Sequence, residues 1–187
     1  MPLPRLKNPW VILSESIEFE NPWLKLTNYK TQNPKGDPAD YGVVHFKNRA
    51  VGVIPYADGY VWMVGQTRFA LGQYSWEIPE GGCPEGESLI ETAHRELKEE
   101  TGITAAQMQP LLKLHTSNSV TDEYGEIFLA TDLTFGPAQH EDSEDITVEK
   151  FTLDALCAFI DQGEITDLMT IAAIHKLKLM QLSGEIS

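Results

Sequence analysis

The chain has 187 residues, of which 42% are hydrophobic and 22% are charged, and its formal net charge is −14. This length suits one sizeable domain, alone or with a small appendage. The negative charge argues against sequence-independent binding of long DNA or RNA, which relies on Lys and Arg to neutralise phosphates. No apolar run approaches the ~18 residues of a membrane span, and the start of the chain lacks the apolar segment of a signal peptide, so we expect no membrane contact and a cytoplasmic protein. Cys83 and Cys157 are expected to be reduced thiols.

Residues 1–45 differ in pattern from the rest of the chain. Two short strand-like pieces flank Asn21 and Pro22 within residues 16–29, and residues 33–40 form a loop rich in Pro, Gly and Asp. The segment has too few apolar residues for a core of its own. We therefore predict a small antiparallel sheet that packs on the main domain, residues 46–187, or on a second subunit.

A hairpin is predicted next. Strand-like residues 50–56 and 60–65 flank Asp58 and Gly59, a pair that favours a tight turn because both positions accept positive φ angles. The strand pattern stops at residues 66–72.

A helix is predicted over about residues 89–101. Ser88 and Glu91 have the spacing of a capping box, and Gly102 supplies the stop. Apolar contacts at helical spacing come from Ile90, Ala93 and Leu97.

Three acids crowd the edge of this helix. Glu96, Glu99 and Glu100 project within one arc, where like charges repel by about 0.2 to 0.5 kcal/mol per pair, and acids in the last turn also oppose the helix dipole. Acids placed against both their own repulsion and the helix dipole indicate a functional site. Clustered carboxylates are the ligands that Mg²⁺ or Mn²⁺ needs. The alternative is a solvated acidic face, partly neutralised by Arg95 and Lys98.

The spacing from residue 81 to residue 103 is the most specific signal in the chain. The fixed positions are Gly81, Glu87, Arg95-Glu96-Leu97, Glu99-Glu100 and Gly102-Ile103. This pattern resembles the Nudix box at every fixed position. The resemblance implies a Nudix hydrolase, which cleaves nucleoside diphosphates linked to another moiety, with an α/β/α sandwich around a mixed sheet. Strands interleaved with helices along the chain favour the same α/β class.

The resemblance also implies a metal site. Its Mg²⁺ ligands, with Mn²⁺ as the alternative ion, are Glu96 and Glu100 first, then Glu99 and the backbone carbonyl of Glu80. Arg95 is expected to hold Glu87 or Glu99 in place. Gly81 and Gly82 are expected to allow close approach of the backbone to the diphosphate.

The segment before the box is similar to that of nucleoside diphosphate sugar hydrolases of the ADP-ribose pyrophosphatase type. Gln66, Arg68 and a Trp-Glu-x-Pro-x-Gly element carry this similarity. By resemblance Arg68 contacts the substrate and Glu77 positions it, and a planar guanidinium can bind a phosphate with two hydrogen bonds. The alternative for Arg68 is an ordinary surface arginine.

The N-terminal sheet of such enzymes often helps to build a homodimer, and its aromatic residues can stack on the substrate base. Trp23 is the first candidate for stacking, ahead of Trp10 and Tyr29. A packing or dimer-interface role for Trp23 is the favoured alternative.

After the box, strands are expected at residues 111–115, 126–133 and 146–151, with a polar loop at 117–125. Helices are expected at residues 154–161 and at 167 to about 182. The apolar face of the last helix is predicted to consist of Leu168, Ile171, Ala172, His175 and Leu179.

The acidic loop over residues 135–145 matches the place of the general base in the ADP-ribose pyrophosphatase type. Glu144 is our first candidate and Glu141 the second. The alternative is that the whole loop is a solvent-exposed, mobile surface loop. Glu99 would then have to serve as the base.

These expectations describe Mg²⁺-dependent hydrolysis of the pyrophosphate bond of nucleoside diphosphate sugars, ADP-ribose first, to a nucleoside monophosphate and a sugar phosphate. Ser117, Asn118 and Ser119 replace a proline expected in this enzyme type, so base and sugar stay open. The alternatives are a nucleoside triphosphate or dinucleoside polyphosphate hydrolase of the same family, and a non-catalytic nucleotide sensor.

Overall fold

The computed structural model describes residue 3 and residues 6–138 and 145–186. The chain forms two compact units. The N-terminal unit consists of Met1–Lys47 and Ser117–Glu123, and the main unit of Asn48–Thr116 and Tyr124–Ser187. Among the described residues, no helix is both long and apolar enough to cross a membrane.

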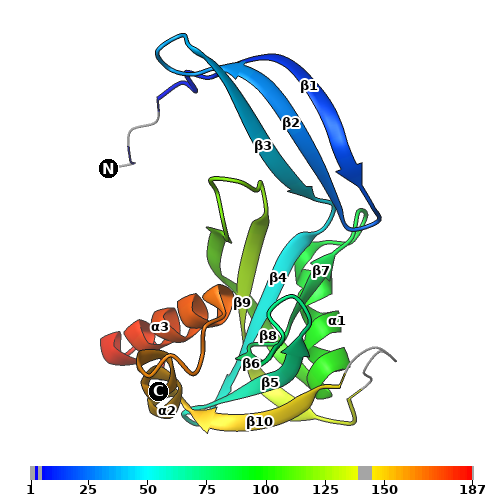
Figure 1. The fold of residues 1–187 in the computed structure, drawn as a ribbon. Coiled ribbons are helices and arrows are strands. Elements are labelled where there is room, and N and C mark those ends of the chain that lie inside the picture. Colours follow the sequence, from blue (N-terminus) through cyan, green and yellow to red (C-terminus); the bar gives the residue numbers. More distant parts are fainter. Residues whose placement is uncertain (1–2, 4–5, 139–144, 187) are drawn as a thin grey trace. The chain divides into compact units, whose positions relative to one another are not determined.

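The N-terminal unit contains an antiparallel sheet of β1 (Val11–Glu20), β2 (Leu24–Gln32) and β3 (Pro38–Phe46), in that order (Figure 1). The expected small antiparallel sheet is therefore present, although β1 begins five residues before the predicted strand-like region. The side-chain oxygen of Asn21 forms the turn between β1 and β2 by accepting the N–H groups of Trp23 and Leu24 at 2.9 and 2.8 Å. Residues 117–123, predicted as a loop of the main domain, join this unit through a parallel bridge between Thr121 and Val44.

The main unit is built on a mixed sheet. Its strands are β4 (Arg49–Ala57), β5 (Tyr60–Arg68), β6 (Gln73–Glu77), β7 (Glu80–Cys83), β8 (Ile103–His115), β9 (Tyr124–Phe135) and β10 (Thr147–Thr152). The order is β10-β5-β4-β9-β8, with β6 paired to β5 and β7 paired to β4. The β4–β9 pair is parallel and the other pairs are antiparallel. Asp58 and Gly59 have φ angles of 51° and 80°, which confirms the predicted hairpin turn.

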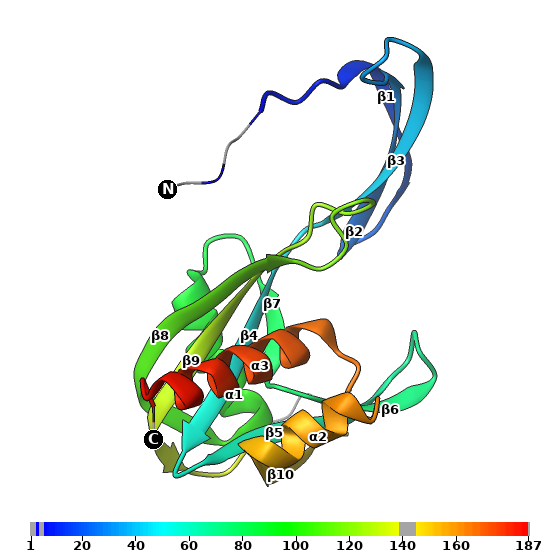
Figure 2. The ribbon, with the colours of Figure 1, turned by 90° about the vertical axis from the view of Figure 1, so that its left-hand side faces the viewer.

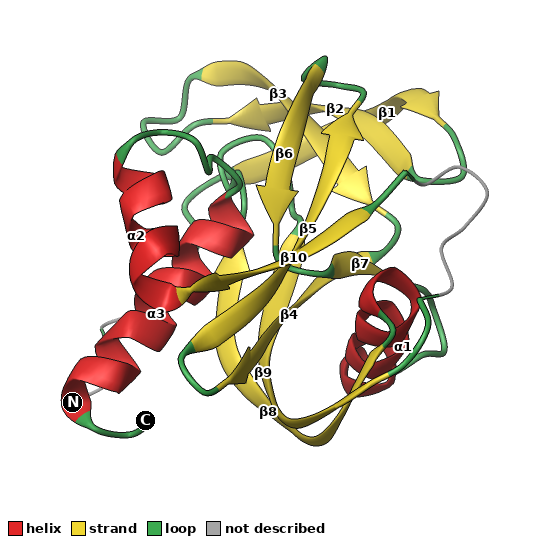
Figure 3. Cartoon of the chain, turned by 90° about the horizontal axis from the view of Figure 1, so that it is seen from below, coloured by secondary structure: helices red, strands yellow, loops and turns green. Residues whose placement is uncertain are grey.

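Helices cover both faces of this sheet. Helix α1 (Leu89–Thr101) lies on one face, and α2 (Leu153–Asp161) and α3 (Leu168–Ser183) lie on the other (Figure 3). Helices α2 and α3 pack side by side (Figure 2). A separate apolar core fills the space on each face. The expected α/β/α sandwich with a mixed sheet is confirmed.

Helix α1 has the predicted boundaries. The Ser88 and Glu91 side chains form both halves of the capping box, and Gly102 ends the helix with a φ angle of 71°. Ala93 and Leu97 are fully buried as predicted, but Ile90 is 43% exposed, so its assignment to the packed face is wrong. Ile90 lies in the first turn of the helix, at its exposed end.

The predicted apolar face of α3 is correct only in part. Ile171 and Ala172 pack against the core as predicted, but the buried side chains of the helix are Met169, Thr170, Ala173, Ile174 and Leu177. Leu168 and Leu179 are 48% and 63% exposed, and His175 is exposed as well. The face that is buried combines the apolar side chains of Met169, Ile174 and Leu177 with a polar residue, Thr170, whose hydroxyl accepts a hydrogen bond from the backbone N–H of Ile78.

Candidate active site

Arg95 organises the carboxylates of α1. Its guanidinium donates to Glu87 from Nε and Nη2 at 3.2 and 3.1 Å, and to Glu96 and Glu99 from Nη1 at 2.7 and 3.0 Å. Nη2 also donates to the carbonyl of Gly82 at 3.2 Å. The hydrogen bonds with Glu87 are the main reason why the pKa of Arg95 is raised. One cation thus offsets the repulsion between acids that face the same side of the helix.

Two contacts join α1 to the start of β7. The backbone N–H of Glu80 donates to Oε2 of Glu100 at 3.0 Å, and Glu100 is only 3% exposed. The carboxylate of Glu96 packs so closely over Gly81 that a Cβ at position 81 would collide with it. The Gly81 φ angle lies outside the left-handed region, so a lack of space for a side chain, rather than backbone conformation, is the reason for glycine here.

Arg68, at the end of β5, is held by two acids. Its Nε donates to the two carboxylate oxygens of Glu77 at 3.0 and 2.9 Å, and its Nη2 donates to Glu77 and to Glu80 at 2.5 and 2.8 Å. Burial lowers the pKa of Arg68, but the hydrogen bonds and negative charge of Glu77 outweigh it and raise the pKa overall. Glu77 is 3% exposed, so this ion pair fixes the guanidinium in one place.

The Glu80 carboxyl group lies among other acids. Carboxylate oxygens of Glu77, Glu80 and Asp167 lie within 4.8 Å of one another. Oε2 of Glu80 is buried and has no hydrogen-bond partner within the part of the chain that the structure describes. Burial, together with the charge of Asp167, raises the pKa of Glu80 well above that of an ordinary glutamate.

Asp167 was not predicted as a site residue. It precedes α3, where its side chain accepts the N–H of Thr170 at 2.7 Å as the helix N-cap. Its proximity to Glu77 and Glu80 depends on how α3 packs on the sheet. No sequence motif signals that packing.

The residues predicted as metal ligands suit a divalent cation. Their donor atoms are carboxylate oxygens and a backbone carbonyl, which Mg²⁺ and Mn²⁺ prefer. The missing Cβ at Gly81 leaves the Glu96 carboxylate against the backbone of β7, and the Glu80 amide fixes the carboxylate of Glu100. The structure therefore brings Glu80, Glu96 and Glu100 to one junction between α1 and β7.

The contacts of the main unit do not test the remaining predicted site residues. Trp23 belongs to the N-terminal unit and is 70% exposed. The two general-base candidates, Glu141 and Glu144, lie outside the described residues. Their roles stay predictions.

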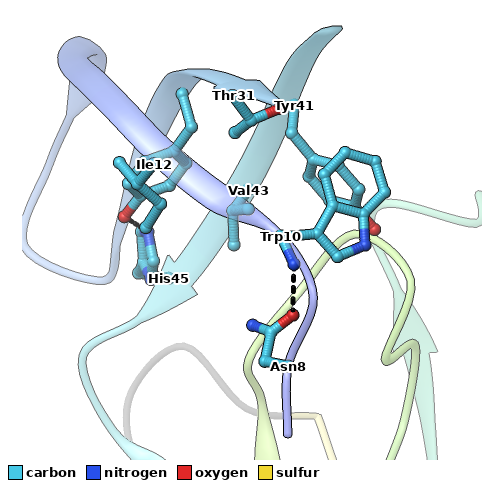
Figure 4. A pocket seen from close by; sticks show the side chains of 8 residues that line it. Asn8, Trp10, Ile12, Thr31, Tyr41, Val43 and His45 are labelled. Carbon is cyan, nitrogen blue, oxygen red and sulfur yellow. Dashed lines mark hydrogen bonds between the residues drawn. The ribbon is translucent and has the colours of Figure 1, made fainter. Parts of the chain in front are cut away.

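The N-terminal unit has a cavity of about 330 Å³ (Figure 4). It is lined by Asn8, Trp10, Ile12, Tyr29, Thr31, Tyr41, Val43 and His45. The rings of Trp10 and Tyr41 meet edge to face at 5.4 Å, and the hydroxyl of Tyr29 lies 3.1 Å from Nε2 of His45. Nδ1 of His45 lies 2.5 Å from the carboxylate of Asp122. Two of the predicted stacking candidates, Trp10 and Tyr29, thus line one aromatic cavity.

Comparisons with known proteins identify the family and the fold of the chain. Residues 46–169 match the model of the NUDIX domain family. The chain is 36% identical over 135 residues to an ADP-ribose pyrophosphatase of Bacillus subtilis (strain 168), an alignment that covers 71% of this chain and 73% of the relative. It is 29% identical over 172 residues to a methanol dehydrogenase activator of Bacillus methanolicus, which covers 91% and 92% of the two chains. A crystal structure of an ADP compounds hydrolase has the same fold, with a TM-score of 0.86 at 19% identity over 98% of this chain and 100% of the other.

Proposed function

Because the chain belongs to the NUDIX family, we propose that it hydrolyses the pyrophosphate bond of nucleoside diphosphate sugars, ADP-ribose first, in a Mg²⁺-dependent reaction. The products would be a nucleoside monophosphate and a sugar phosphate. The junction of Glu80, Glu96 and Glu100 between α1 and β7 carries the proposal, because oxygens clustered in this way can hold the divalent cation that neutralises a diphosphate. The relative from Bacillus subtilis, named as an ADP-ribose pyrophosphatase, supports the choice of substrate.

Carboxylates of α1 would hold the ion, with Mn²⁺ as an alternative to Mg²⁺. The proposed ligands are the Glu80 carbonyl and the side chains of Glu96, Glu99 and Glu100. When bound, the ion supplies neutralisation of the diphosphate charge and activation of water. Arg95 keeps two of these carboxylates oriented, which is the task of a residue that supports metal ligands.

Roles in substrate binding and in catalysis are proposed for further residues. Arg68, fixed by Glu77, offers a positive charge to a phosphate group of the substrate. Gly81 and Gly82 were predicted to let the diphosphate approach the backbone, but the Glu96 carboxylate fills the space at Gly81 and the Asn48 side chain fills that at Gly82, so a diphosphate would have to approach past these side chains. For the general base we propose Glu144, or else Glu141, with Glu99 as the alternative, and glutamine variants at each position distinguish them by the loss of the acidic limb of the pH–rate profile.

We propose that the N-terminal unit contributes to base recognition and forms a homodimer. Trp23 is exposed and available for stacking, and Trp10 lines the aromatic cavity. Strand β1 presents apolar side chains to solvent, with Ile12, Leu13 and Ile17 exposed by 62%, 59% and 59%. Exposed apolar side chains on a strand at the edge of a sheet can form a contact with another protein chain.

A cytoplasmic location is also proposed. Cys83 and Cys157 are both free thiols, although Cys157 is only half-buried. Reduced cysteines fit a compartment in which thioredoxin and glutathione keep thiols reduced.

A substrate panel tests the function. The purified protein is incubated with Mg²⁺ and ADP-ribose, UDP-glucose, GDP-mannose, ATP or a dinucleoside tetraphosphate, and the products are separated by chromatography. We expect AMP and ribose 5-phosphate from ADP-ribose as the fastest reaction. No monophosphate from any of the sugar nucleotides would refute the substrate class, and faster turnover of ATP or of the dinucleotide would favour the other hydrolase types.

The variant Glu100→Gln separates an enzyme from a nucleotide sensor. It keeps the size of a buried side chain and an oxygen that can accept the Glu80 N–H, but it removes the charge. We expect a loss of turnover by at least about 100-fold with an unchanged circular dichroism spectrum. Equal turnover in wild type and variant would show that Glu100 takes no part in the chemistry.

A further inference from the structure

The first turn of α3 makes a direct contact with the segment that carries the site. The backbone N–H of Ile78 donates to Oγ1 of Thr170 at 2.9 Å, across 92 positions of sequence. Both residues have no exposed surface. This hydrogen bond therefore lies in the core, where no water can replace Thr170 as the partner.

The segment of residues 77–80 links the predicted roles of Arg68 and the metal ligands. At one end Glu77 holds the guanidinium of Arg68 with paired hydrogen bonds. At the other end the amide of Glu80 donates to Glu100, and its carbonyl is the proposed metal ligand. A shift of this short segment would move the substrate-binding cation and a metal ligand at the same time.

Neighbouring elements fix the same segment on its other sides. The N–H of Val53 on β4 donates to the carbonyl of Pro79 at 2.8 Å. The side chain of Ile78 fills the space above Gly52, where a Cβ would lie 2.8 Å from Ile78 Cδ1 and 3.0 Å from Met169 Cε. Packing holds the side chain of Ile78, and the hydroxyl of Thr170 holds its backbone N–H.

Thr170 is itself held in position. The carboxylate of Asp167 caps α3 by accepting the N–H of Thr170 at 2.7 Å. Thr170 thus accepts from Ile78 with its side chain while its backbone is tied to the cap. The position of the hydroxyl is fixed by the start of a helix rather than by a flexible loop.

We propose that Thr170 is a positioning residue for hydrolysis, which acts through Ile78 to hold the segment of residues 77–80 in its working place. The proposal rests on the proposed function, because that function gives Arg68 and the Glu80 carbonyl their tasks. Thr170 itself touches neither substrate nor metal. The competing interpretation is that Thr170 is only a satisfied core residue, and it predicts an effect on stability alone.

Two matched pairs of side chains test the proposal. Thr170→Val keeps the shape of threonine and replaces the hydroxyl with a methyl group, whereas Thr170→Ser keeps the hydroxyl. The second comparison is Thr170→Ala with Thr170→Ser, which differ by the hydroxyl group. It replaces the first comparison if the valine variant does not fold. Ile174→Val, at a fully buried position of the same helix, is the control for loss of core packing.

The readouts are kcat, KM for ADP-ribose, the Mg²⁺ concentration for half-maximal rate, the Mn²⁺ affinity, and hydrogen exchange of the Ile78 amide by NMR. We expect the valine and alanine variants to lose about 10- to 100-fold in kcat/KM, to require more Mg²⁺, and to exchange the Ile78 amide faster. Thr170→Ser should keep kcat/KM, the Mg²⁺ requirement and the Ile78 amide exchange close to those of the wild type. Ile174→Val should also behave as the wild type. The proposal is overturned if the valine variant matches Ile174→Val, or if the amide exchanges faster while turnover is unchanged.

Failure of the proposed function gives a different result. In that case the wild type itself does not release AMP from ADP-ribose. Amide exchange and Mn²⁺ affinity still decide the proposal, since neither needs turnover. Unchanged Mn²⁺ affinity in a valine variant whose Ile78 amide exchanges faster would then refute it.

Discussion

Gly81→Ala would act through the side chain of one glutamate. The new Cβ would overlap the carboxylate of Glu96, which also accepts a hydrogen bond from Arg95 at 2.7 Å. Glu96 must therefore move away from β7, because the β7 backbone cannot yield without breaking its pairing with β4. The backbone conformation at position 81 accepts alanine, so the fold should persist.

The size of the effect follows from this displacement. Removing the overlap requires a shift on the order of 1 Å, and a misplacement of that size at a reacting centre costs about 100-fold in rate. This loss corresponds to about 2.7 kcal/mol of transition-state stabilisation. We expect the Mg²⁺ requirement to rise as well, since Glu96 is a proposed ligand.

The assay is the steady-state rate of AMP release from ADP-ribose across a Mg²⁺ titration, with thermal unfolding as a check of the fold. Gly42→Ala is the control, because a Cβ at position 42 meets no atom within 4 Å. A double-mutant cycle with Glu96→Ala tests the cause. In the Glu96→Ala background the change at position 81 should have little further effect, and fully additive losses would refute the explanation by collision.

Three further predictions concern charge and assembly. Arg95→Ala leaves the acids of α1 without their shared cation, so the Mg²⁺ concentration for half-maximal rate should rise by about 10- to 100-fold; an unchanged titration curve would contradict this. The pKa of Glu80 is raised from the ordinary value of 4.5, so the folded protein binds more protons than the unfolded chain above that value, and its stability falls as the pH rises. Urea unfolding in the presence of a chelator should therefore show Glu80→Gln gaining stability over the wild type as the pH rises above 4.5, and a difference in unfolding free energy that does not change with pH would exclude the effect. Leu13→Asp places a charge on the exposed apolar surface of β1 and should turn a dimer into a monomer in analytical ultracentrifugation, whereas a wild type that already sediments as a monomer would rule out the interface.

The elements that were predicted correctly depend on short-range chemistry. Helix α1 begins and ends as expected because its capping box and its Gly102 stop are formed by residues within the helix or next to it. The hairpin turn at Asp58 and Gly59 is equally local. These features need no knowledge of what packs against them.

The incorrect predictions depend on tertiary contacts. Leu168 and Leu179 were assigned to the apolar face of α3 but are exposed, and the buried face includes a polar residue, Thr170, whose hydroxyl accepts the N–H of Ile78. The buried face of a helix is predicted from the spacing of its apolar residues. A polar residue that is buried because it forms a hydrogen bond is therefore missed. The proximity of Asp167 to Glu80 was missed for the same reason.

The candidate site was predictable in part. Residue types and spacing located the acids of α1 and the arginines. They could not show that Arg68 would be fixed by both Glu77 and Glu80, because that pairing requires β5, β6 and β7 to meet. Arg95 was expected to hold Glu87 or Glu99, and it pairs with both and with Glu96 as well, because Glu87 is brought beside the helix by the chain that precedes it.

The discontinuous make-up of the N-terminal unit limits how this protein can be recombined with its relatives. Residues 117–123 supply the Ser119 carbonyl that accepts the Tyr41 hydroxyl at 2.6 Å, and the Asp122 carboxylate that pairs with His45. A chimaera that exchanged residues 1–47 alone would put a foreign sheet against this native stretch and lose these contacts. Both stretches would have to be transplanted together, and substitutions in one are expected to be compensated in the other.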